Sequence, residues 1–307
     1  MKSFNHFLRE KGVTSDIRSL LYHIARAAKY INFSIRSTNT GKAGTMNVFG
    51  ESQAALDVMS DEIITRELKR SELVSLIASE EQDDPVSCEA TRGNFLVAYD
   101  PLDGSSLIDV NLAIGSIFGI WDTPDILGKK VGENMVASAY VVYGPRVTLV
   151  ISIKGKGTHE FELNDVGEYM LSEENLSVSD TYQCFAPGNL KCTNENEGYY
   201  NLVEHWIKSG KKLRYSGGMV PDINHILCKG QGVFSYPRDK ENPDGKLRLL
   251  FECAPFSFAM EEAGGLGMNQ EGERVLDTIV KDYHQNTPIF VGSKDAVDES
   301  MKILPAA

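Results

Sequence analysis

The chain has 307 residues, of which 31 are Lys or Arg and 43 are Asp or Glu, so its formal net charge is −12. Domains usually hold about 100 to 200 residues, so this length predicts one large or two medium domains with a sizeable core. The acidic balance argues against nucleic acid and against a membrane surface as partners, since binding to either depends on clustered Lys and Arg. No run reaches the ~18 apolar residues that a membrane-spanning helix needs.

The cysteines and the first residues bear on the compartment. The five cysteines include no C-x-x-C pair and leave one unmatched in any disulfide scheme. The first residues lack the apolar stretch of a secretory signal. We therefore expect a cytoplasmic protein whose cysteines are ordinary core or surface thiols.

Helical periodicity dominates the beginning of the chain. Apolar residues recur at helical spacing over residues 17–35, which predicts an amphipathic helix. Residues 41–50 break this pattern with three glycines, and the pattern resumes over residues 54–68. We expect two helices joined by a mobile loop.

Runs of β-branched and aromatic residues predict strands at 73–77, 94–99, 116–121, 139–143 and 147–151. Later patterns predict a helix at 200–208, strands at 232–236 and 248–251, and a helix at 257–263. Because helices and strands interleave throughout, the predicted class is α/β. The polar stretch at 171–197 marks a candidate domain boundary near residue 180, although a loop within one domain fits it equally well.

The most informative stretch is the motif Asp-Pro-Leu-Asp-Gly-Ser-Ser at residues 100–106, which follows an apolar run. The carboxylates of Asp100 and Asp103 and the carbonyl of Leu102 are hard oxygen ligands suited to Mg²⁺. Gly104 lets backbone N–H groups approach a phosphate, and the two serines add donors. An ordinary turn is the alternative, since these residue types are the commonest in turns.

Further carboxylates follow apolar runs elsewhere. Glu80 and Glu81 end the run at 73–79, and Glu252 ends the run at 247–251. Convergence of these acids with the motif at one sheet edge would make a metal site, whereas each acid alone would be a solvated cap. Asp57 lies within the second predicted helix, where an exposed position is the alternative interpretation.

The motif at 100–106 resembles the central motif of the magnesium-dependent, lithium-sensitive sugar and inositol phosphatases. Residues 246–255, Lys-Leu-Arg-Leu-Leu-Phe-Glu-Cys-Ala-Pro, resemble the signature of class I fructose-1,6-bisphosphatases. Collinear similarity extends through residues 56–60, 117–120, 196–199, 217–222, 275–277 and 284–285. The resemblance implies a layered α-β-α-β-α sandwich of the sugar phosphatase type. Its two sub-domains would be residues 1–180, with the metal motif and an allosteric-type region, and residues 181–307, which bind the sugar phosphate.

By the same resemblance, about two or three Mg²⁺ ions per subunit, with Mn²⁺ as the alternative, would surround the 1-phosphate. The metal ligands would be Glu80, Asp100, the Leu102 carbonyl, Asp103 and Glu252. The catalytic carboxylates that relay a proton would be Glu81 and Asp57, and a further family aspartate falls on Glu51, which has a longer side chain. The substrate-binding residues would be Gly104, Ser105, Ser106, Asn196, Tyr199, Arg214, Tyr215, Met219, Tyr236 and Lys246.

Within the substrate-binding set, the resemblance assigns different roles. The positions that contact the 6-phosphate are Asn196, Tyr199, Tyr215 and Tyr236. Lys246 would reach the sugar ring, and Arg214 would come from a neighbouring subunit, which implies a homo-oligomer of the homotetrameric kind. A buried core position is the alternative for each tyrosine, and a surface charge is the alternative for Lys246. One family lysine falls on Glu241, next to Lys240.

The implied activity is hydrolysis of the 1-phosphate of D-fructose 1,6-bisphosphate to fructose 6-phosphate and phosphate, a step of gluconeogenesis and carbohydrate metabolism. Sedoheptulose-1,7-bisphosphatase activity, alone or in addition, is the alternative within the class. A catalytically inactive sugar-phosphate binder would not need every metal carboxylate. An inositol monophosphatase would not explain the matches at 196–199, at 214–215 and at Lys246.

Many members of this family are inhibited by AMP, and this sequence departs from the pattern that binds it. Arg18 stands where a small hydroxyl residue is expected, Asn94 and Phe95 replace a Lys-Tyr pair, and Asp122 occupies an arginine position. The last change places a carboxylate beside an anionic ligand. We therefore predict weak or no inhibition by AMP.

Overall fold

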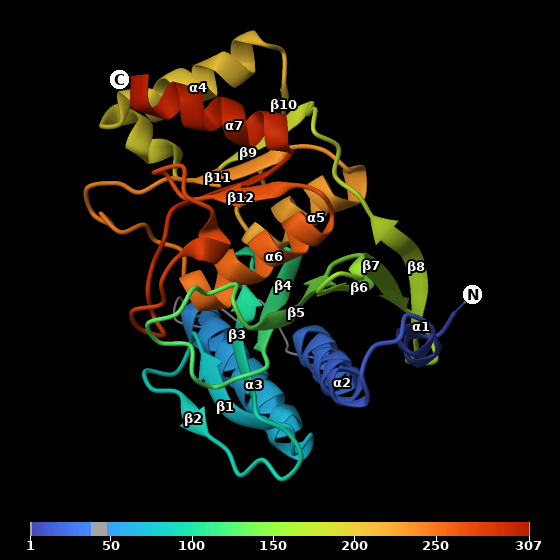
Figure 1. Ribbon diagram of the computed structural model, residues 1–307. Helices are drawn as coiled ribbons and strands as arrows, with labels where there is room; N and C mark the ends of the chain where they lie inside the picture. The colour runs from blue at the N-terminus through green and yellow to red at the C-terminus, as the bar shows by residue number, and fades with distance from the viewer. Residues whose placement is uncertain (1, 38–47, 307) are drawn as a thin grey trace.

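The computed structural model describes the backbone of residues 2–37 and 48–306 and the side chains of residues 2–37 and 55–305. Two sheets and three groups of helices alternate in it (Figure 1). Most of the predicted loop at 41–50 lies outside the described residues, and its last three residues belong to a helix. No helix in the described part of the chain combines the length and apolar character needed to cross a bilayer.

The larger sheet has eight strands in the order β2-β1-β3-β4-β5-β6-β7-β8. β1 and β3 run parallel, and the other neighbouring pairs are antiparallel. The strands are β1 (Val74–Ser79), β2 (Val86–Ser87), β3 (Phe95–Asp103), β4 (Ile114–Trp121), β5 (Met135–Tyr143), β6 (Val147–Ile153), β7 (Gly157–Leu163) and β8 (Tyr169–Leu176).

The smaller sheet has five strands in the order β10-β9-β11-β13-β12. β9 is parallel to both β10 and β11, whereas β13 is antiparallel to β11 and β12. The strands are β9 (Cys184–Pro187), β10 (Lys212–Leu213), β11 (Val233–Tyr236), β12 (Leu266–Met268) and β13 (Ile289–Gly292).

The helices form three layers around these sheets (Figure 1). α1 (Phe4–Glu10), α2 (Ser15–Ser37) and α3 (Val48–Arg70) cover one face of the larger sheet. α5 (Met219–Lys229) and α6 (Ala254–Glu262) lie between the sheets, and α4 (Glu197–Lys208) and α7 (Lys294–Ile303) cover the outer face of the smaller sheet. Short helical turns are η1 (Ser105–Leu107), η2 (Leu190–Asn194), η3 (Leu249–Cys253), η4 (Val275–Asp277) and η5 (Leu304–Ala306). The predicted α/β class and layered α-β-α-β-α sandwich are confirmed.

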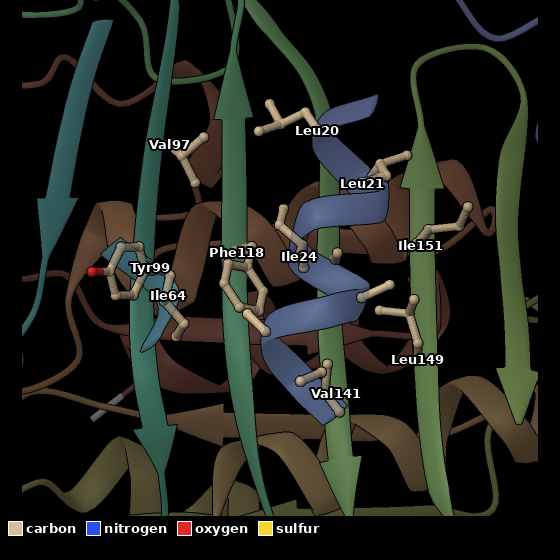
Figure 2. Close-up of a cluster of buried hydrophobic side chains, with 14 of the residues drawn as sticks. Leu20, Leu21, Ile24, Ile64, Val97, Tyr99, Phe118, Val141, Leu149 and Ile151 are labelled. Carbon is tan, nitrogen blue, oxygen red and sulfur yellow. The ribbon is translucent and has the colours of Figure 1, made fainter. Parts of the chain in front are cut away.

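Both faces of the larger sheet are buried at its centre. On β3, Val97 and Tyr99 join the cluster beneath α2 and α3 (Figure 2), whereas Leu96 and Ala98 join the cluster on the side of α5 and α6. All four side chains are 0 % exposed. Strands buried on both faces read as continuous apolar runs rather than as alternating ones. This burial explains why the sequence identified these central strands.

Most of the predicted elements are found. The helices predicted at 17–35, 54–68, 200–208 and 257–263 correspond to α2, α3, α4 and α6, although α3 begins earlier than predicted. The strands predicted from residue 73 to residue 151 correspond to β1, β3, β4, β5 and β6, and the strand at 232–236 corresponds to β11. Helices α1, α5 and α7 have no counterpart among the predicted elements.

The strand predicted at 248–251 is wrong. Residues Leu249–Cys253 form the π-helical turn η3, and Arg248 alone makes an isolated β-bridge, to Asn286. A short apolar run does not distinguish a strand from a buried helical segment, because both are apolar throughout. Glu252 therefore precedes helix α6 instead of ending a strand.

The two halves of the chain belong to different sheets but share a core. β8 ends the larger sheet at Leu176, and β9 begins the smaller sheet at Cys184. One buried cluster nevertheless takes Val150 from β6 and Val291 from β13. The division into sub-domains at residue 180 stays a prediction.

Candidate active site

Three buried carboxylates meet beside the end of β3. Asp100 and Asp103 lie on this strand, and Glu252 lies in η3, directly before α6. Each can offer an oxygen that lies within 4.8 Å of the oxygens of the other two. The cluster forms part of the wall of a cavity of about 310 Å³, which extends to residues of β11 in the smaller sheet. Strand ends and turns from both halves of the chain thus form one site.

A bulge in β3 brings Asp100 and Asp103 to the same side. In a regular strand, residues three apart face opposite sides of the sheet. Here the register with β4 shifts between these two residues, so β3 has an additional residue relative to β4. Within the bulge, the backbone N–H of Leu102 donates to Asp100 Oδ1 at 2.9 Å, and the hydroxyl of Ser116 donates to the carbonyl of Pro101 at 2.7 Å. These two bonds fix the local backbone.

The first residues of α5 hold Asp103. The backbone N–H of Val220 donates to Asp103 Oδ2 at 2.7 Å, and the N–H of Met219 adds a second hydrogen bond. This close approach depends on Gly115, the β4 partner of Asp103, because a Cβ there would lie 2.4 Å from Val220 Cγ1. A side chain at this position would push α5 away from the metal motif.

Glu252 is held by its own helical turn. The backbone N–H of Arg248 donates to Glu252 Oε2 at 2.6 Å. The guanidinium of Arg248 lies 3.8 Å from the carboxylate of Glu80 and donates to the His284 carbonyl at 3.0 Å. Arg248 therefore links Glu80, which follows β1, to the segment that precedes β13.

Burial among like charges raises the pKa values of the cluster. Desolvation is the largest cause for each acid, and it raises the pKa of Asp100 and Glu252 well above their usual values. The pKa of Glu80 rises to about 7, with the charge of Arg248 opposing the shift, and that of Asp103 rises to about 6, with the α5 N–H groups opposing it. An ionised form of this cluster is costly without a compensating positive charge.

The donor set fits a hard divalent cation. Each side chain of the cluster offers only carboxylate oxygens, and no His or Cys contributes to it among the described residues. Ions such as Mg²⁺, Mn²⁺ and Ca²⁺ prefer oxygen ligands, whereas softer metals favour nitrogen or sulfur. Leu102, whose carbonyl is a predicted ligand, lines the same cavity. The predicted metal ligands are thus brought together.

Asp57 reaches this site from α3. Its carboxyl group faces Glu81 and accepts a hydrogen bond from the side chain of Ser105. Burial, and next the charge of Glu81, raise the pKa of Asp57 to about 6, and the bond from Ser105 opposes the shift. Glu81 lines the cavity and is exposed. Glu51 lies near the start of α3, and its side chain is outside the described part of the structure.

The same cavity also carries hydroxyl and ammonium groups. Tyr215, Tyr236 and Lys246 line it, together with Met219 and, nearer the metal motif, Gly104 and Ser105. Burial raises the pKa of Tyr215 and of Tyr236 above their usual values, so both hydroxyls remain protonated donors at neutral pH. Six of the ten predicted substrate-binding residues therefore surround one space with the acidic cluster.

The other four predicted substrate-binding residues do not appear among the residues that line this cavity. Tyr199 is 0 % exposed and belongs to the core between α4 and the smaller sheet, where its hydroxyl donates to the Gly188 carbonyl at 2.7 Å. Asn196 caps α4 by accepting from the N–H of Tyr199 at 2.9 Å. Arg214 and Ser106 are exposed. Of the two interpretations of Tyr199, the buried core position describes this structure.

Two polar residues that organise the site were not among those predicted from the sequence. Arg248 is the one charged residue inside the apolar run 247–251, which could have marked it. Asp222 is buried in α5 and accepts from the backbone N–H of Ser216 at 2.8 Å, and so holds the loop that carries Tyr215. An aspartate within an apolar segment is the signal that could have identified it, since buried acids need partners.

A layered α/β fold with a carboxylate cluster that could hold a divalent cation beside a small polar cavity is typical of divalent-metal-dependent hydrolases of small molecules. Family models narrow this class. Residues 3–174 match the model of the fructose-1-6-bisphosphatase N-terminal domain, and residues 178–305 match the model of its C-terminal domain. The chain belongs to the class 1 fructose-1,6-bisphosphatase family.

Individual relatives agree with this assignment. A class 1 fructose-1,6-bisphosphatase of Trichlorobacter lovleyi is 44% identical over 307 residues, covering 99% of this chain and 95% of the relative. A chloroplastic sedoheptulose-1,7-bisphosphatase of Spinacia oleracea is 37% identical, over 98% of this chain and 78% of the relative. The crystal structure of the fructose-1,6-bisphosphatase of Leishmania major in its holo form superimposes with a TM-score of 0.88 at 31% identity, covering 98% of each chain.

Proposed function

We propose that this protein hydrolyses the 1-phosphate of D-fructose 1,6-bisphosphate to give fructose 6-phosphate and phosphate. The observation that carries the proposal is a cavity of about 310 Å³ whose wall contains two chemically different sets of residues. Buried carboxylates form one set, which we name the acidic end, and tyrosine hydroxyls with a lysine ammonium form the other, which we name the sugar end. A bisphosphate needs this difference, because one phosphate is cleaved and the other is only held.

The acidic end holds the reacting phosphate. The ligands for Mg²⁺ are Asp100, Asp103 and Glu252, with Glu80 and the Leu102 carbonyl, and Mn²⁺ is the alternative ion. This set of ligands would accommodate about two or three ions per subunit. When bound, divalent cations neutralise the phosphate oxygens, make water a better nucleophile and stabilise the leaving alkoxide. The carboxylates hold their positions before binding, because backbone N–H groups fix Asp100, Asp103 and Glu252.

Glu81 and Asp57 accept the proton of the attacking water. Asp57 has a pKa of about 6, so it is ionised at neutral pH and close to the value at which a general base is most effective. The negative charge of Glu81 beside it favours proton uptake by the pair. The hydroxyl of Ser105 keeps Asp57 directed toward the metal motif.

The other end orients the sugar. The hydroxyls of Tyr215 and Tyr236 donate to the 6-phosphate, and the Lys246 ammonium reaches the ring. Arg214, which is exposed, would complete the anion site of a neighbouring subunit in a homotetramer. Binding at this end without metal leaves the 6-phosphate intact, because nothing there activates a nucleophile.

Phosphate release after EDTA treatment tests the proposal. The purified protein is assayed with fructose 1,6-bisphosphate, sedoheptulose 1,7-bisphosphate and fructose 6-phosphate, each with and without Mg²⁺ or Mn²⁺. We expect metal-dependent release from fructose 1,6-bisphosphate and none from fructose 6-phosphate. A higher kcat/KM for sedoheptulose 1,7-bisphosphate would favour the second sugar bisphosphate as the substrate, and absence of metal-dependent release from both would refute the proposed hydrolysis.

A further inference from the structure

A buried acid outside the cavity contacts the turn that carries Glu80 and Glu81. Asp61 lies one helical turn after Asp57 on α3 and is 7 % exposed. Its Oδ2 accepts a hydrogen bond at 2.5 Å from the side-chain amide of Gln82. Its Oδ1 accepts a second bond at 2.7 Å from the hydroxyl of Tyr99. Asp61 does not appear among the cavity-lining residues or the acidic cluster.

Tyr99 fixes Asp61 from the sheet side. Its ring belongs to the core beneath α2 and α3, and its hydroxyl oxygen points away from the α2 side chains (Figure 2). This hydroxyl also lies 2.8 Å from the hydroxyl of Thr65, one turn further along α3. The rigid ring in a packed core gives the carboxylate of Asp61 one position relative to β3.

Gln82 is held from two sides. Asp61 binds its side chain, and its backbone carbonyl lies 2.9 Å from Nε2 of His284, which belongs to the C-terminal half of the chain. The imidazole of His284 packs at an angle of 67° against the ring of Phe251 in η3, one residue before Glu252. The turn at residues 80–82 is thus bonded to both the helix that carries Asp57 and the segment that borders Glu252.

A contribution to protein stability alone does not explain why a carboxylate is buried at Asp61. Within the described residues it forms no ion pair, and its partners are two neutral donors. Removing a carboxylate from water without a cation has a large cost, and apolar side chains of similar volume often stabilise such a position better. A bond that fixes a particular neighbour gives this charge a role that an apolar residue could not have.

We propose that Asp61 is a positioning residue: its hydrogen bonds to Gln82 and Tyr99 set the turn that directs Glu80 toward the bound metal and Glu81 toward the attacking water. This inference rests on the proposed function for the role of Glu81, but not for the geometry of the turn. Glu80 is a metal ligand in the same proposal, so a shift of the turn changes metal affinity even without substrate.

An exchange of the two hydrogen-bonding groups tests this role. Gln82→Glu places a carboxylate against that of Asp61, and no rotation of either group relieves the contact. Adding Asp61→Asn restores a donor-acceptor pair in the opposite direction, because the asparagine amide donates to the new glutamate while its oxygen still accepts from Tyr99. Glu62→Gln is the matched control, since Glu62 is an exposed neighbour on the same helix.

Two readouts are measured on folded protein, with thermal unfolding as the check: Mn²⁺ affinity by titration without substrate, and kcat and KM for fructose 1,6-bisphosphate. We expect Gln82→Glu to weaken Mn²⁺ binding and lower kcat by about tenfold each, with KM within about threefold of wild type. The double variant should recover both to within about threefold, and Glu62→Gln should match wild type.

A double variant no better than Gln82→Glu in Mn²⁺ binding would overturn the role of Asp61, whatever the activity. Losses of Mn²⁺ affinity and of kcat that follow the unfolding temperature equally in all variants would also overturn it. A bond with a purely structural role would not change kcat while leaving KM unaffected. A wild-type protein that binds Mn²⁺ but releases no phosphate would instead contradict the proposed function, and the Mn²⁺ titrations would still decide the positioning role.

Discussion

The two ends of the cavity differ in burial and in how they are held. At the acidic end, Asp100 and Glu252 are 6 % exposed each, and the backbone N–H groups of Leu102 in the bulge and of Arg248, directly before η3, fix them. At the sugar end, Tyr215 is 43 % exposed, and Lys246 is exposed as well. The acidic end is therefore rigid and costly until a cation arrives, whereas the sugar end is solvated and gains its contacts from the substrate. Variants of the acidic end should therefore impair the catalytic step, and variants of the sugar end should impair substrate binding.

The largest effect is expected for Asp100→Asn. Asparagine keeps the oxygen that accepts from Leu102, so the bulge remains, but the anionic metal ligand is lost. We expect kcat to fall by about 10³-fold or more, because metal-based charge stabilisation contributes several kcal/mol and each ~1.4 kcal/mol is a factor of ten. Steady-state kinetics at saturating Mg²⁺ measures this loss, with circular dichroism as the folding control. Activity within tenfold of wild type would remove the acidic cluster from the mechanism.

A smaller loss is expected for Asp57→Asn. This change removes the group that accepts the proton but leaves the metal ligands in place. General base catalysis typically contributes about 10² to 10⁴-fold, so kcat should fall by about 10²-fold with KM nearly unchanged. The wild-type acidic limb of kcat/KM should titrate near pH 6, the value to which burial and Glu81 raise the pKa of Asp57, and the variant should lose this limb. An unchanged pH profile would assign the base to another residue.

Lys246→Met sharpens the comparison from the sugar end. Methionine retains most of the length of lysine but has no charge, and Lys246 lines the cavity that the acidic cluster also lines. We expect KM for fructose 1,6-bisphosphate to rise by about tenfold and kcat to remain within threefold, because the lost contact is made equally in the ground and transition states. A loss confined to kcat would mean that this end takes part in the chemistry.

The acidic end should also make the metal-free protein sensitive to pH. Burial raises the pKa of Glu80 to about 7 and of Asp103 to about 6, so the folded state binds more protons than the unfolded state between about pH 4 and 7. Stability in EDTA should therefore fall as the pH rises from 5 to 7, by a few degrees in Tm. Mg²⁺ should restore it more at pH 7.5 than at pH 5. Differential scanning calorimetry checks this, and a Tm that rises with pH in EDTA would contradict the buried cluster.

The smallest effect is expected from AMP. The guanidinium of Arg18 donates to the Val13 carbonyl at 2.7 Å and so folds back over the start of α2, while Asn94 and Asp122 are exposed and carry no positive charge. Of these three positions only Arg18 carries a positive charge, and its guanidinium already binds the Val13 carbonyl. Assays with millimolar AMP should show less than about twofold inhibition, and strong cooperative inhibition would contradict this expectation.

The sequence predicted those features of the fold and of the site that depend on local residue patterns. The apolar runs predicted the central strands, and the motif with Asp100 and Asp103 predicted part of the acidic cluster that the structure contains. The helical turn η3 was mistaken for a strand, since a short apolar run has no distinctive period. The core position of Tyr199 was only the alternative interpretation of the sequence, because a matched motif does not report the burial of its side chain in this chain.

Contacts between distant segments were also beyond the sequence. Nothing in the residues around Asp61 predicts that it meets Gln82, which belongs to a turn 21 positions away. The hydrogen bond from Val220 to Asp103, which are 117 positions apart, likewise depends on how α5 packs against the sheet. Such contacts follow from tertiary packing. The motif determines which chemical groups are in the site, and the packing determines their positions.

The central claim is that the acidic end cleaves the 1-phosphate while the sugar end only holds the 6-phosphate. Phosphorus NMR of the sugar product, formed from fructose 1,6-bisphosphate by the Mg²⁺-loaded protein, tests it most directly. The predicted result is fructose 6-phosphate and inorganic phosphate, with no signal from fructose 1-phosphate. Formation of fructose 1-phosphate, alone or in a mixture, would contradict the assignment of the two ends.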